Sequence, residues 1–109
     1  MRGIYEPGTV LKPKEFVERA LKKLEIGRDE IVGRTKRHEV VRAREILMTV
    51  GVERFNLRVK DLASELGVKY DTASLWGRRG AKRRSKDRDF AKGAESVVRA
   101  VAVGEPAAT

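Results

Sequence analysis

The stretch VKDLASELGVKYDTASLWGRR, from Val59 to Arg79, decides the fold that the sequence predicts. Apolar residues at helical spacing predict a short helix that ends at Leu66. Gly67 follows it, and glycine adopts the left-handed conformation that ends a helix at little cost. A second helix begins at about Tyr70, so only a short turn separates the pair. This spacing is typical of a helix-turn-helix, here at about 57–79.

The second helix of the pair is predicted to end near Gly77 to Gly80, because two glycines so close together disfavour its continuation. Ala63 is small where the two helices approach closest. Val68, Ala73 and Trp76 are predicted to close the core beneath the second helix. The side chains left facing outward are Lys69, Tyr70, Asp71, Thr72, Ser74 and Arg78.

The outward side chains suit the major groove of DNA. A second helix in this motif presents its first side chains to base edges, while the first helix braces against the backbone. Lys69 and Arg78 can donate to guanine or to a phosphate. Thr72 and Ser74 can contact a phosphate or a thymine methyl group. The pattern therefore predicts a protein that binds double-stranded DNA.

Tyr70 and Asp71 each have two interpretations. Tyr70 can be imagined as a nucleophile, but without a metal or a general base it more simply stacks or hydrogen-bonds at the DNA surface. Asp71 can accept a hydrogen bond from cytosine N4, or it can cap the start of the helix. The sequence favours the cap slightly.

Two basic runs flank the helix pair, Arg34 to Arg44 and Arg78 to Arg88. Phosphates on either side of a groove need such charges to neutralise them. An ordinary helical hairpin is the alternative for the helix pair alone, but it explains the flanking charge less well. The candidate phosphate contacts in these runs are Arg34, Lys36, Arg37, Arg44, Arg79, Lys82 and Arg83.

The overall composition agrees with a polyanionic partner. The 109 residues include 25 Lys and Arg against 16 Asp and Glu, a formal net charge of +9. The absence of cysteine excludes a disulfide framework and a thiolate zinc site. The sequence has no G-x-x-x-x-G-K-[ST] loop and only one His. We therefore expect no cofactor, no metal, no small-molecule substrate and no enzymatic activity.

No apolar run approaches the roughly 18 residues that a bilayer span needs. The N-terminal residues also lack the uninterrupted apolar segment of a secretory signal. We therefore expect a cytoplasmic, nucleoid-associated protein without a membrane partner.

The rest of the chain predicts further helices around the helix pair, in a compact all-α bundle of about five to six helices. One helix runs from Pro13 to before Gly27, and a short turn follows before Gly33. The next runs from His38 to about Val50, with Gly51 as its stop. Residues 1–12 are predicted to be an arm, 13–103 the DNA-binding domain and 104–109 a flexible tail.

The last predicted helix, at about 87–103, leaves one alternative open. Its apolar face can pack within the chain, or it can dock a second copy as a homodimer with the basic residues serving solubility. RNA binding is a further alternative, although the chain lacks a platform of exposed aromatic residues. The face in question is made of Phe90, Ala94, Val97, Val98 and Val101.

The stretches GRTKRHEVVRAREILM and FNLRVKDLASELGVKYDTASLWGRRG resemble the DNA-binding domain that closes the replication initiator DnaA. They resemble more closely the C-terminal domain of REP-associated tyrosine transposases. The similar motifs, in the same order, are Phe16 to Arg19, Gly33-Arg34, Val40 to Arg44, Leu66 to Ser74 and Arg78 to Gly80.

The resemblance implies a DnaA C-terminal or Trp-repressor-like fold, and it implies one further DNA contact. The minor-groove arginine of the DnaA pattern falls on Arg42, and a narrow A·T-rich groove attracts such a charge. The alternative is a surface charge paired with Glu39 or Glu45. In the DnaA recognition motif only Gly67 and Thr72 match outright, so DNA binding is implied but the same target sequence is not.

Overall fold

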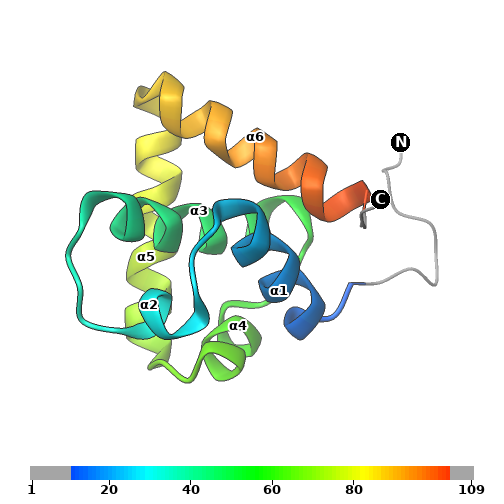
Figure 1. Cartoon of the computed structure of the whole chain (residues 1–109), viewed down its shortest axis with the longest axis vertical. Helices are drawn as coiled ribbons and strands as arrows, with labels where there is room; N and C mark the ends of the chain where they lie inside the picture. Colours follow the sequence, from blue (N-terminus) through cyan, green and yellow to red (C-terminus); the bar gives the residue numbers. More distant parts are fainter. Residues whose placement is uncertain (1–10, 104–109) are drawn as a thin grey trace.

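The computed structural model describes residues 11–103, which form six α-helices and no strand (Figure 1). This confirms the predicted all-α bundle. Only the last two residues of the predicted arm are described, and the predicted tail lies outside the described residues. The helices are α1 (Pro13–Leu24), α2 (Arg28–Val32), α3 (His38–Arg54), α4 (Val59–Leu66), α5 (Tyr70–Lys86) and α6 (Arg88–Val103).

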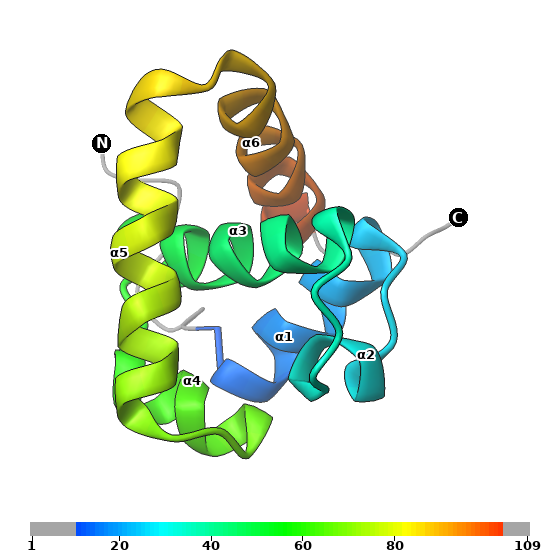
Figure 2. The same ribbon diagram turned by 90° about the vertical axis from the view of Figure 1, so that its left-hand side faces the viewer.

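The central element is α3, which contacts each of the other five helices (Figures 1 and 2). Its residues from Ala43 to Gly51 are all buried, including the polar Arg44, Glu45 and Thr49. This middle part of α3 is covered on every side, so its charged residues need partners inside the protein.

Gly51 was predicted to stop this helix, and that prediction is wrong. The helix continues to Arg54, and Gly51 is buried where α3 meets α1 and α4. A Cβ atom there would lie 2.9 Å from both the Phe16 ring and the Leu62 side chain. Gly51 therefore provides room for close packing rather than a helix end.

The apolar face of α6 is buried against α1, α3 and α5. Phe90, Val97 and Val101 are almost completely inaccessible to solvent, and Ala94 and Val98 are buried beside them. Of the two alternatives for this face, the structure shows packing within its own chain.

The second helix of the pair, α5, has 17 residues and runs without a break through Gly77 and Gly80. The prediction that it ends near these glycines is wrong. Gly80 is buried against α3, where its lack of a side chain lets the two helices approach closely. The helix ends at Lys86. The next residue is Asp87, whose carboxylate Oδ1 accepts a hydrogen bond from the Phe90 amide and so caps α6.

None of the helices found within residues 11–103 has the length and apolar composition needed to cross a membrane.

Candidate nucleic-acid interface

Helices α4 and α5 form a helix-turn-helix arrangement, with α4 lying across the lower end of α5 in Figure 1. Three residues connect them. Gly67 has a φ of 75°, and the Val68 amide donates to the Ala63 carbonyl at 3.0 Å. This left-handed cap turns the chain sharply, as predicted. Ala63 and Ala73 are buried where the helices meet, so their small side chains permit the close crossing.

The first turn of α5 projects into solvent. Lys69, Tyr70 and Asp71 are exposed, while Thr72 and Ser74 are half-buried. Tyr70 is 56% exposed and is the only large hydrophobic side chain so exposed among the described residues. A ring in this position can contact a base or a sugar without first leaving the core. These side chains thus meet the geometric requirement for reading a groove.

Asp71 does not cap α5. The residue at the cap position is Lys69, and no side chain hydrogen-bonds to the amides there. Asp71 lies in the first turn, where its charge interacts favourably with the helix dipole. The preferred interpretation of Asp71 as a cap is therefore wrong, and its carboxylate is available to accept a hydrogen bond from a partner.

Four cations lie along the solvent side of α5, opposite the glycines that face α3. All four are exposed, and none forms an ion pair with an acid among residues 11–103. The only internal contact in the set is a 2.9 Å hydrogen bond from Arg78 Nη1 to Ser74 Oγ. We call this set the outer α5 face: Arg78, Arg79, Lys82 and Lys86. Lys86 was not singled out from the sequence, although its i+4 spacing from Lys82 was the available signal.

Arg83, by contrast, points back toward α3. Its Nε donates to Glu45 Oε1 at 2.7 Å, and Glu45 is only 2% exposed. A buried carboxylate needs such a partner, because an unpaired charge inside the protein is costly. The structure therefore gives Arg83 a stabilising role in place of the predicted free phosphate contact.

Replacing Arg83 with Met should lower the free energy of unfolding by about 2 kcal/mol. Breaking a fully buried pair costs more, but Arg83 is 40% exposed, so solvent screens part of the loss. The matched control is Arg84→Met at the next position, whose partner Glu53 is partly exposed. We expect that control to cost less than about 1 kcal/mol in urea denaturation. Equal losses in the two variants would contradict the role assigned to Arg83.

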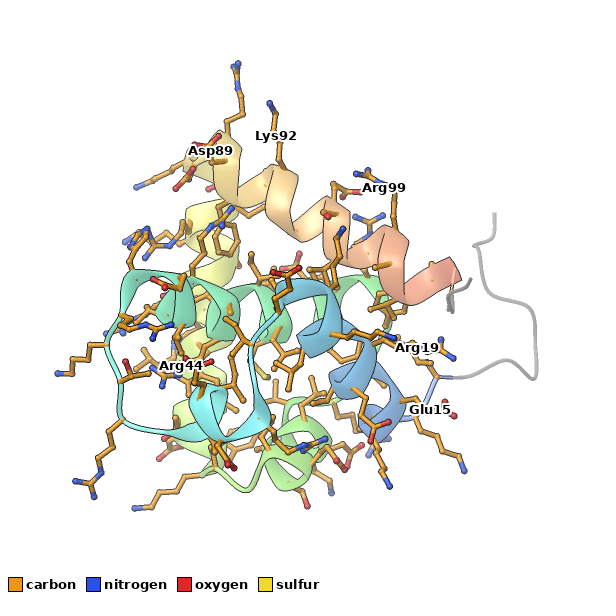
Figure 3. All side chains as sticks on the ribbon, viewed as in Figure 1. Glu15, Arg19, Arg44, Asp89, Lys92 and Arg99 are labelled. Atoms are coloured by element: carbon orange, nitrogen blue, oxygen red, sulfur yellow. The ribbon has the colours of Figure 1, made fainter. Side chains whose placement is uncertain are left out.

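Arg44 does not belong to the candidate interface, because its side chain is buried. It is 8% exposed and donates three hydrogen bonds, to the carbonyls of Ile31 (2.8 Å), Gly33 (2.7 Å) and Thr35 (3.0 Å). Its Cζ also lies 5.5 Å from the centre of the Trp76 ring on α5. Burial lowers the pKa of the Arg44 guanidinium, because desolvation disfavours the charged form. In Figure 3 Arg44 lies among the helices, whereas Lys92 points away from the fold.

Arg42, the minor-groove candidate, connects α3 to the start of α6 through a hydrogen bond. Its Nη2 donates to the Asp89 carbonyl at 2.8 Å, and the guanidinium passes over Gly93. A hollow of about 540 Å³ beside it is lined by His38 and by three cations and three acids. This balance of charge gives the hollow no preference for a phosphate, so neither Arg42 nor His38 belongs to the main basic surface.

The loop Gly33–Arg37 between α2 and α3 carries two further cations, Arg34 and Lys36. Both are exposed, and neither has an ion-pair partner among the described residues. Arg37, also predicted as a phosphate contact, bridges Glu30 at 3.1 Å and Glu39 at 3.2 Å. Part of its charge is therefore satisfied within the chain.

The loop and α5 face the same side of the molecule, the side turned toward the viewer in Figure 2. α1 lies below α3 in that view, to the right of α5. The two segments that carry these unpaired cations thus lie on one side of the molecule. No group of three or more His, Asp or Glu side chains in the described chain is arranged to hold a metal ion.

Comparison of the chain with family models, with curated proteins and with solved structures found no match. The resemblance to DnaA and to the transposase domains therefore stays a prediction.

Proposed function

We propose that this chain binds double-stranded DNA sequence-specifically, with the first turn of α5 in the major groove. The observation that carries the proposal is the outer α5 face, whose four cations have no acidic partner among residues 11–103. An unsatisfied row of positive charge along an exposed helix favours a polyanion. A protein with this function would be nucleoid-associated.

The two halves of α5 suit two kinds of contact. The helix has 17 residues and is about 25 Å long at 1.5 Å per residue. Its first turn carries Lys69, Tyr70 and Thr72, which can hydrogen-bond to base edges or pack against a thymine methyl group. The outer α5 face begins two turns later, where the groove wall presents phosphates. Base reading and charge neutralisation are thus divided along one helix.

The helix-turn-helix arrangement supports double-stranded DNA over RNA. The deep, narrow major groove of an RNA helix does not admit a helix of this kind, whereas that of B-DNA does. Single-stranded RNA is usually bound by stacking on several aromatic side chains. Tyr70 is the single exposed large aromatic residue in the described part of the chain, which is too few for such a platform.

Duplex binding should weaken steeply as salt is raised. The outer α5 face with Arg34 and Lys36 supplies six cations, and each phosphate contact contributes about −0.9 to the slope of log K against log salt. We therefore expect a slope of about −5 for a short duplex, measured by fluorescence anisotropy. A flat dependence, or tighter binding to an RNA duplex of the same sequence, would contradict the proposal.

The same duplex assay tests sequence preference when bound sequences are first selected from a random pool. Lys69→Ala should relax the preference at particular bases, because it removes a donor from the reading turn. Lys86→Ala is the control and should weaken all sequences alike. If both variants weaken every sequence equally, α5 does not read bases.

A further inference from the structure

The way Arg44 holds the loop Gly33–Arg37 has a consequence for DNA binding. Its three nitrogen atoms donate to the carbonyls of Ile31, Gly33 and Thr35, which are every second residue along the backbone. Arg34 lies between Gly33 and Thr35, and Lys36 follows Thr35. Both of these side chains are exposed. One guanidinium thus holds the inner edge of the loop while the loop's cations face solvent.

Arg44 also connects the loop to α5. The guanidinium lies against the Trp76 ring, with 5.5 Å from Cζ to the ring centre, and Trp76 follows the reading turn of α5 by one turn. No acid among residues 11–103 pairs with Arg44, so only carbonyl oxygens and the ring compensate its charge. A planar cation with forked donors and an aromatic contact suits this position, and a lysine would not replace it.

We infer that Arg44 is a positioning residue that sets the loop at a fixed place beside α5, so that Arg34 and Lys36 bind the phosphates flanking the groove that α5 enters. The inference rests on the proposed function, and it adds a second DNA-contacting segment together with the buried side chain that places it. In Figure 2 the loop lies on the same side of the molecule as α5 but apart from it. The contact between Arg44 and Trp76 connects the two segments.

The test compares Arg44→Lys with Arg34→Ala/Lys36→Ala in the full chain, using the salt dependence of duplex binding. Arg44→Lys keeps the charge but loses the three-way hydrogen bonding, so the loop cations lose their fixed place. Both variants should reduce the magnitude of the slope by about 2, since two phosphate contacts are lost. Combining them should give no further reduction. The base preference selected by α5 should stay that of the wild type in every case.

A stabilising role alone would lower the folded fraction of Arg44→Lys without changing the slope. A wild-type slope in folded Arg44→Lys, or in Arg34→Ala/Lys36→Ala, overturns the inference. Additive reductions in the combined variant also overturn it. Absence of salt-dependent binding in the wild type would instead overturn the proposed function itself.

If Arg44→Lys does not fold, Trp76→Leu decides the question. This change leaves the three carbonyl hydrogen bonds in place but removes the aromatic face through which Arg44 contacts α5. A reduced slope in folded Trp76→Leu supports the inference, and a wild-type slope overturns it.

Discussion

Reversing the charge of the outer α5 face should lower duplex affinity by roughly 10²–10³-fold. If the chain binds DNA as proposed, four attractive contacts with phosphates become repulsive. Like charges brought together at an interface cost several kcal/mol, and each 1.4 kcal/mol is a tenfold change in affinity. The fold should survive, because none of the four residues forms an ion pair within the described chain. The variant carries Arg78→Glu, Arg79→Glu, Lys82→Glu and Lys86→Glu, and its affinity is measured by anisotropy at fixed salt.

A matched control distinguishes the effect of this particular face on DNA affinity from the effect of the lower net charge. It reverses four exposed cations on α1 and α6: Lys14→Glu, Lys22→Glu, Lys23→Glu and Arg99→Glu. Each variant changes the formal charge by 4 × −2, from +9 to +1. The control should bind within about tenfold of the wild type, because only the long-range field is altered. Equal losses in the two variants would show that no particular face of the protein binds DNA.

Gly80→Ala should destabilise the protein although it adds only one methyl group to α5. A Cβ atom there would lie 2.0 Å from Thr49 Oγ1 and 2.5 Å from the Glu45 carbonyl oxygen. Rotation of Thr49 can relieve the first contact, but the second is with backbone, so α3 and α5 must separate. Overpacking of this kind costs about 3 kcal/mol, and the better helix propensity of alanine returns about 1 kcal/mol. We expect urea denaturation to show a net loss of about 2 kcal/mol.

Gly77→Ala is the natural control for this prediction, one turn earlier on the same helix. A Cβ atom at Gly77 would meet only Met48 Cβ, at an ordinary 3.8 Å. The substitution should therefore stabilise the protein by up to about 1 kcal/mol through helix propensity alone. If Gly80→Ala were also stabilising, the close approach of α3 and α5 would be wrong.

The features that the sequence predicted correctly are those fixed by local rules. Gly67 ends α4 in the left-handed conformation because no other residue does so as cheaply, and the short turn to α5 follows from it. The exposure of Lys69 and Tyr70 follows from helical spacing once the buried Ala73 is placed. These inferences need no knowledge of what packs against the helix pair.

The errors come from glycines whose role depends on distant parts of the chain. Gly51 and Gly80 look like helix ends, because glycine disfavours a helix interior. In the structure each lies where another helix approaches too closely for a side chain. The stabilisation that keeps α3 and α5 helical at these points comes from packing between elements, which a local pattern does not contain.

The same limit explains the mistaken assignments in the candidate interface. Arg44 and Arg83 lie in basic runs, and by composition they do not differ from the exposed Arg34 and Arg79. Only the position of α3 at the centre of the bundle brings Arg44 to the loop carbonyls and Glu45 to Arg83. Charge counting identifies a basic segment, but tertiary packing decides which of its cations remain available.

The exposed first turn of α5 also bears on how such a protein can evolve. Lys69, Tyr70 and Asp71 form no hydrogen bond or ion pair through their side chains with the rest of the described chain. Mutations at these positions should therefore cost little stability, in contrast to those along α3. If α5 reads bases as proposed, related sequences could change their DNA target at these positions while the rest of the fold stays the same.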